Sequence, residues 1–145
     1  MGIEIWQLER PKGRKPRWAY RITDDVTYVF DSRSVSVHVL SPDAARWIAR
    51  LIEGLRSRTQ TLHWNGDLKD DCSAVWKKFH AHAEHLQGPR RGGIWYCSVG
   101  DVDGNRFFHT ADYPDIQPRS GAAARWLCEL MISSANAGFL QIYAA

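Results

Sequence analysis

The same four residues, Ala-Ala-Arg-Trp, occur twice in this chain, at positions 44–47 and 123–126. In each copy a serine, Ser41 or Ser120, stands three residues before the first alanine, where its hydroxyl can cap the start of a helix. Apolar residues then continue at intervals of three and four, which is typical of an amphipathic helix with one buried face. The sequence therefore predicts two such helices, with the tryptophan of each copy at an equivalent place in the core.

Short stretches in which apolar and polar residues alternate predict β-strands before each of these helices, and one more after the second helix. The predicted strands lie at 3–9, 17–23, 27–31, 34–40, 94–101, 106–110 and 138–144. Asp103-Gly104-Asn105 is a strong hairpin signal between two of them, since such residues accept the positive φ of a tight turn. This alternation is typical of antiparallel strands with one face on the core.

The middle of the chain predicts a further helix over about residues 69–87. Its apolar residues fall close to helical spacing, at Cys72, Val75, Trp76, Phe79, Ala83 and Leu86. A helical insert of about residues 59–92 would then separate two repeat-like halves, about 3–58 and 93–145. Each half contains a strand hairpin followed by a helix, which indicates an internal duplication.

These elements predict a single α+β domain spanning residues 1–145. We expect an antiparallel sheet of about six or seven strands, with the amphipathic helices packed on one face. We also expect approximate internal twofold symmetry, because the strand-hairpin-helix unit recurs. A chain of 145 residues is long enough to bury one sizeable core without a metal or a disulfide.

Composition places the chain among ordinary globular proteins, with 44% hydrophobic and 24% charged residues. Apolar residues nowhere follow one another for the roughly 18 positions that a membrane-spanning helix needs, and no signal peptide is recognisable. We therefore expect a cytoplasmic protein with no membrane partner. Its three cysteines, Cys72, Cys97 and Cys128, are odd in number and widely spaced, so we expect reduced thiols in the core.

Basic residues gather in two loop-forming segments, although the net charge is only +3. One segment, rich in proline and glycine, is flanked by Trp18 and carries Arg10, Lys12, Arg14, Lys15 and Arg17. The other carries Arg90 and Arg91, and the predicted helices add Arg46, Arg50 and Arg125. Cations beside aromatic rings can bind phosphates and stack on bases, so these residues are the candidate binding site for nucleic acid or another partner.

The segment Phe-His-Ala-His-Ala-Glu-His at 79–85 is the densest group of potential metal ligands. The candidate ligands are His80, His82, Glu84 and His85, and on a helix they would point in several directions. A zinc site needs three or four convergent ligands, so a second element would have to contribute. We expect a solvated polar face here, with no cofactor, and keep a metal-dependent enzyme as an alternative.

Four strands followed by a helix, then a partial second copy, resemble in outline the repeats of Whirly and PUR-type single-strand-binding proteins, without signature residues of either. The sequence favours a non-catalytic binding protein that engages nucleic acid or a nucleoprotein complex through basic loops and aromatic side chains. The alternative is a small inhibitor that blocks a protein partner, of the immunity or phage anti-defence type, because tryptophan and arginine are common at the centres of protein interfaces.

Overall fold

A computed structural model describes residues 2–24, 29–67, 71–85, 94–138 and 140 of the chain. Within these residues the chain forms an α+β fold of two helices and two antiparallel sheets, one of five strands and one of four. The predicted α+β class is therefore correct, but the single sheet of six or seven strands is wrong. The predicted closing strand at 138–144 falls largely outside the described residues.

The five-stranded sheet, sheet A, contains most of the strands predicted in the first half of the chain. It consists of β1 (Gly2–Gln7), β2 (Trp18–Thr23), β3 (Val29–Asp31), β4 (Val37–Val39) and β9 (Ile116–Pro118). The strands run in the order β1-β2-β4-β9, and β3 pairs with β2. The predicted strand at 34–40 is shorter than expected, because a turn of 3-10 helix at Ser32–Ser34 precedes β4. Sheet A therefore takes its last strand from the far end of the sequence.

The four-stranded sheet, sheet B, contains β5 (Cys72–Trp76), β6 (Phe79–His85), β7 (Trp95–Asp101) and β8 (Arg106–His109), in that order. The predicted helix at 69–87, and with it the helical insert, is wrong: within this range the residues from Cys72 to His85 form the β5–β6 hairpin. Residues 79, 81 and 83 are buried while 80, 82 and 84 are not, so the period is two. The turn is tight, and Lys77 adopts a positive φ of 54° in it.

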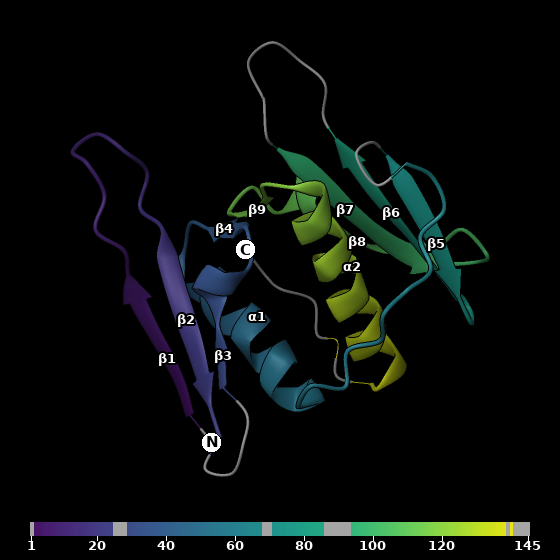
Figure 1. The fold of residues 1–145 in the computed structure, drawn as a ribbon, viewed down its shortest axis with the longest axis horizontal. Coiled ribbons are helices and arrows are strands. Elements are labelled where there is room, and N and C mark those ends of the chain that lie inside the picture. Colours follow the sequence, from purple (N-terminus) through teal and green to yellow (C-terminus); the bar gives the residue numbers. More distant parts are fainter. Residues whose placement is uncertain (1, 25–28, 68–70, 86–93, 139, 141–145) are drawn as a thin grey trace.

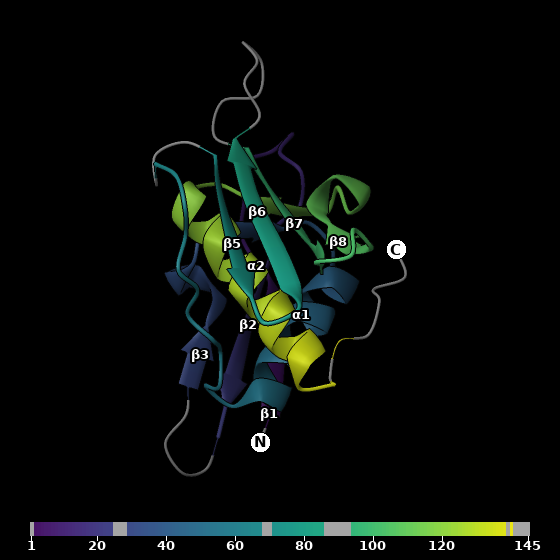
Figure 2. The same ribbon diagram turned by 90° about the vertical axis from the view of Figure 1, so that its right-hand side faces the viewer.

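Both predicted amphipathic helices are present, as α1 (Pro42–Leu55) and α2 (Gly121–Asn136). The hydroxyls of Ser41 and Ser120 accept hydrogen bonds from the backbone N–H of Ala44 at 3.1 Å and Ala123 at 3.0 Å. The helices lie side by side between the two sheets, as Figure 1 shows edge-on and Figure 2 from the side of sheet B. The core therefore has three layers, with α1 against β1 and β2 and α2 against β6 and β7.

The two halves of the chain are joined by main-chain pairing between β4 and β9. Beyond the paired residues, Leu40 N donates to Asp115 O at 2.8 Å and Arg119 N donates to Ser36 O at 2.7 Å. The indole ring of Trp47 on α1 stacks on Phe108 of β8 at 5.6 Å between ring centroids. Each half therefore contributes structure to the other.

Several contacts in one half have a counterpart in the other. Tyr20 N donates to the side-chain oxygen of Ser32 at 2.9 Å, and Cys97 N donates to that of Thr110 at 3.0 Å. Both accepting residues begin a turn of 3-10 helix that leads into a short strand. Trp126 of α2 stacks on Phe30 of β3, with 5.8 Å between the ring centroids. Each of the two tryptophans thus stacks on a phenylalanine from the other half of the chain.

A basic cluster as the candidate functional site

The candidate site lies on the outer face of sheet A, opposite the face that packs on α1. Val37 and Val39 of β4 are buried in the core, so His38 between them points to the outer face. In β9, Ile116 and Pro118 are buried in the same way, and Arg119 follows directly after the strand. Two residues from distant parts of the sequence, His38 and Arg119, are therefore brought to the same part of the outer face, where the charge of Arg119 acts on His38.

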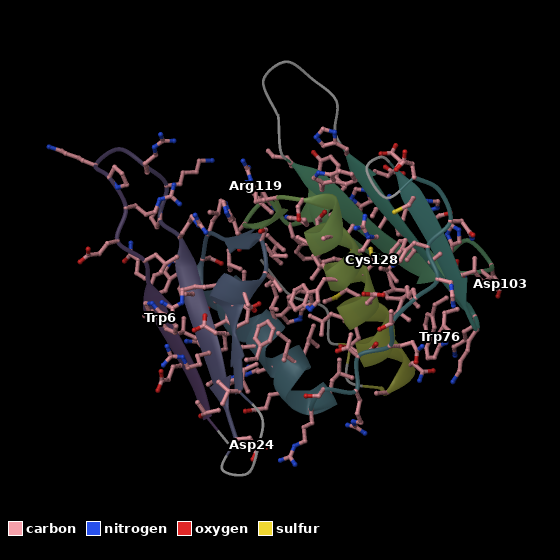
Figure 3. The ribbon with its side chains drawn as sticks, viewed as in Figure 1. Trp6, Asp24, Trp76, Asp103, Arg119 and Cys128 are labelled. Atoms are coloured by element: carbon pink, nitrogen blue, oxygen red, sulfur yellow. The ribbon has the colours of Figure 1, made fainter. Side chains whose placement is uncertain are left out.

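The β1–β2 hairpin adds Arg10 and Arg17 to this part of the outer face. Leu8 N donates a hydrogen bond to Arg17 O at 2.8 Å, one residue beyond the ends of β1 and β2. This bond extends the β1–β2 pairing and holds the two ends of the basic loop together. Trp18, the first residue of β2, pairs with Val39 of β4, so Arg17, which directly precedes β2, lies beside the strand that carries His38. Figure 3 shows Arg119 at the end of the molecule from which the β1–β2 loop projects.

Arg10, Arg17, His38 and Arg119, which we call the basic cluster, are close enough for the charges of Arg10 and Arg119 to affect the ionisation of Arg17 and His38. Burial, helped by the charges of Arg10 and Arg119, lowers the pKa of the Arg17 guanidinium. Burial also lowers the pKa of His38 from 6.5 to about 4, and the charges of Arg17, Arg119 and Arg10 add to this effect. The imidazole is therefore neutral at pH 7, surrounded by three positive charges.

Two donors of the basic cluster are buried and have no hydrogen-bond partner within the described part of the chain. These atoms are Nη1 of Arg10 and Nε of Arg17. A buried donor without an acceptor costs free energy, about 1–3 kcal/mol in mutational studies, so such a group needs an acceptor from outside the chain, such as an ordered water, an ion or a ligand. None of the three arginines forms an ion pair with a described carboxylate.

The rest of the outer face of sheet A is different, because its charges are paired. Arg21 lies 3.7 Å from a carboxylate oxygen of Glu4, and Arg33 lies 2.7 Å from one of Asp31. Both guanidinium groups also stack over Trp6, at 5.3 and 5.4 Å from the ring centroid. Trp6 is visible on this face in Figure 3. The excess of positive charge is thus concentrated at the end near Arg119.

The structure places the other predicted binding residues in several environments. Lys12, Arg14 and Lys15 are exposed on the β1–β2 loop next to the basic cluster. The ring of Trp18 packs against the hydrophobic core. Arg90 and Arg91 lie outside the described residues.

The three helix arginines do not join the basic cluster. Arg46 and Arg50 line a cavity of about 300 Å³ with Ile3 and Ile5. Arg46 also forms an ion pair with Asp43 at 3.3 Å. Arg125 hydrogen-bonds the thiol of Cys72 on sheet B, and burial, opposed by this arginine, raises the pKa of that thiol. The arginines of the two repeated motifs therefore face different sheets.

The predicted metal ligands lie on β6. The side chains of His80 and His82 alternate with buried alanines and so share the outer face of sheet B, with ring centroids 4.3 Å apart. Burial and the nearby charge of His80 lower the pKa of His82. Among the described residues, no group of three or more histidine, cysteine, aspartate or glutamate side chains could hold a metal ion.

Sequence reasoning identified Arg10 and Arg17 but missed His38 and Arg119. The hairpin loop is recognisable from its prolines, glycine and cations, whereas Arg119 is a single cation after a short strand. Only the pairing of β4 with β9 brings Arg119 to the hairpin, and that pairing joins residues about half the chain apart. The alternation in Val37-His38-Val39 was the signal that His38 faces away from the core.

Comparisons with models of known families, with curated proteins and with solved structures found no match for this chain. Within the described residues, neither α1 nor α2 has the length and apolar character needed to cross a membrane.

Proposed function

We propose that the chain is a non-catalytic binding protein that engages nucleic acid through the basic cluster. The observation that carries the proposal is the meeting of Arg10, Arg17 and Arg119 without a described carboxylate, with two buried donors left unpaired. Guanidinium groups present several N–H donors in a plane and bind phosphate oxygens in pairs. Repulsion between three neighbouring guanidinium groups lowers the stability of the folded protein. A bound phosphate would offset this repulsion.

The exposed cations of the β1–β2 loop extend this surface. Lys12, Arg14 and Lys15 are exposed beside the basic cluster and can contact further phosphates along a nucleic acid strand. Such contacts release counterions from the nucleic acid, so the affinity should fall steeply as salt concentration rises. The proposal therefore combines a fixed group of arginines with a flanking row of solvated cations.

The test is a fluorescence-anisotropy titration of labelled DNA and RNA, single-stranded and duplex, at several salt concentrations. We expect binding that weakens with salt, and we expect Arg119→Gln to weaken it about tenfold, the effect of losing one charge-assisted hydrogen bond. The matched control is Arg106→Gln, which removes the same charge from sheet B, where Arg106 lies 4.0 Å from Asp112. This control should bind like the unaltered protein.

Two results would contradict the proposal. One is the absence of binding to any of these nucleic acids at low salt, where electrostatic contacts are strongest. The other is an equal loss of affinity in the two arginine variants. Either result would favour the alternative, a chain that blocks a protein partner.

We further propose that the fold arose by internal duplication. The second copy would begin with β6 rather than after an insert, so that β6, β7, β8, β9 and α2 correspond to β1, β2, β3, β4 and α1. The matched serine caps, the matched side-chain hydrogen bonds of Tyr20 N and Cys97 N, and the reciprocal tryptophan stacks support this correspondence. In this view β5 is an addition at the edge of the second copy.

A further inference from the structure

We propose that the basic cluster binds the terminal phosphate monoester of a nucleic acid strand rather than the diester phosphates within it. This inference rests on the proposed function and specifies the group that the cluster recognises. It is carried by three guanidinium groups that meet there without a described carboxylate, by the burial of two of their donors, and by the separate row of exposed cations next to them.

The charge of the cluster fits a dianion. Arg10, Arg17 and Arg119 carry three positive charges, and no described carboxylate pairs with them. A phosphate monoester carries about −1.5 to −2 charges at pH 7, whereas an internal diester carries a single negative charge. The monoester therefore neutralises more of the repulsion between the three guanidinium groups.

The donors of the cluster also match a monoester. A monoester phosphate has three free oxygens, each a strong acceptor, whereas a diester has two. Three guanidinium groups can supply a donor to each of the three oxygens. Nη1 of Arg10 and Nε of Arg17 are the buried donors that lack a partner in the described structure. His38 adds a neutral imidazole, which can donate one further N–H.

The surroundings favour a nucleic acid end over a phosphorylated peptide or a free nucleotide. Lys12, Arg14 and Lys15 are exposed on the adjoining loop and so are accessible to solvent-facing phosphates. In a nucleic acid, the terminal phosphate is followed by regularly spaced diester phosphates. The loop cations can bind these diesters one by one. A phosphopeptide or a mononucleotide would leave the loop cations unused.

The experiment compares one short single-stranded oligonucleotide in three forms: with a 5′-phosphate, with a 3′-phosphate, and with hydroxyls at both ends. We expect the unaltered protein to bind at least one phosphorylated form about tenfold more tightly than the hydroxyl form, as expected for charge-assisted hydrogen bonds. Inorganic phosphate should compete with the phosphorylated form and have much less effect on the hydroxyl form. This competition tests the site without any substitution.

Four variants locate the preference. Arg17→Gln and Arg119→Gln should weaken binding of the phosphorylated form more than binding of the hydroxyl form, so that the ratio of the two affinities falls toward one. Lys12→Gln should weaken binding of both forms by the same factor and so keep their ratio, and Arg106→Gln should change neither. Circular dichroism of each variant establishes that it is folded before its affinity is compared.

Equal affinity for the phosphorylated and hydroxyl forms would overturn the inference and leave the proposed function standing. A preference that survives in both folded arginine variants would overturn it too, because the phosphate would then be bound elsewhere. Stronger displacement by a phosphoserine peptide than by the phosphorylated oligonucleotide would assign the site to a protein ligand. If no form binds at low salt, the proposed function itself fails.

Discussion

His38 has an unusual environment for a histidine, since three arginines surround it and part of its ring is shielded from water. Its charged form is disfavoured for both reasons, and burial is the larger one. The same grouping of arginines on which the proposed phosphate site rests therefore makes the native fold less able to accept a proton there.

The consequence is a loss of stability in mild acid. The pKa of His38 is lowered from 6.5 to about 4 in the folded protein, so between these values the unfolded chain binds a proton that the native state does not. The stabilising effect of the neutral imidazole is complete above pH 6.5 and disappears as the pH falls toward 4. Urea denaturation between pH 7 and 4.5 should therefore show a decreasing free energy of unfolding.

The control for this prediction is His38→Gln, which keeps a neutral polar side chain at the position. It should reduce the pH dependence without abolishing it, because burial also lowers the pKa of His82 and His109. A variant with the same slope as the unaltered protein would show that His38 takes no part in the acid response.

Single residues differed in how far the sequence alone revealed their role. Arg10 and Arg17 were recognisable because they stand in a loop with other cations. Arg119 was not, since no other cation stands beside it in the sequence, and the residues near it in the fold come from distant parts of the chain. Charges that lie close together in sequence can be predicted as a surface, whereas a cluster assembled across a sheet depends on strand pairing that no local pattern specifies.

At the scale of elements, the two serine caps offer a matched pair. Both hydroxyls accept a hydrogen bond from the helix backbone, but the Ser41 hydroxyl also donates to the Asp115 carboxylate at 2.6 Å. Ser120→Ala should lower the free energy of unfolding by about 1 kcal/mol, as is usual for a lost N-cap. Ser41→Ala should cost more, because it also leaves a partly buried carboxylate short of a donor.

Urea denaturation at pH 7 measures both changes under the same conditions. Equal losses in the two variants would mean that the hydrogen bond to Asp115 adds nothing to stability. A larger loss in Ser120→Ala would contradict the expected order outright.

The helices were predicted well and the β5–β6 hairpin was not, for a physical reason. Ser-Pro-Asp and the apolar stripe of α1 specify a helix locally through capping and one-sided burial. Residues 79–84 also carry a local pattern, an alternation of apolar and polar side chains, but its three core residues are two alanines and a phenylalanine, none of them β-branched. Alanine favours helices in isolation, and here the tertiary packing of the sheet overrides that preference.

At the scale of the whole molecule, the two halves depend on each other. Sheet A needs β9 as its last strand, and each tryptophan of the repeated motif stacks on a ring from the other half. We therefore expect thermal and urea unfolding to follow one cooperative transition. Near-ultraviolet circular dichroism, which reports the tryptophans, and far-ultraviolet circular dichroism should give coincident curves.

Fragments test the same interdependence directly. Residues 1–58 and residues 59–145, expressed separately, should each be largely unfolded, and mixing them should restore the near-ultraviolet signal. A fragment that folds alone with a sharp transition would show that the halves are independent domains.

The pairing of β4 with β9 also bears on how the chain folds during its synthesis. The ribosome releases the N-terminal half first, yet the last strand of sheet A ends at Pro118 and the ring that receives Trp47 belongs to Phe108. The N-terminal strands and helix therefore leave the exit tunnel with an unpaired strand edge and an uncovered tryptophan, and they keep both until residues 108–118 have emerged. During that interval the nascent chain presents surfaces of the kind that chaperones bind, and sheet A can be completed only after β9 has left the tunnel.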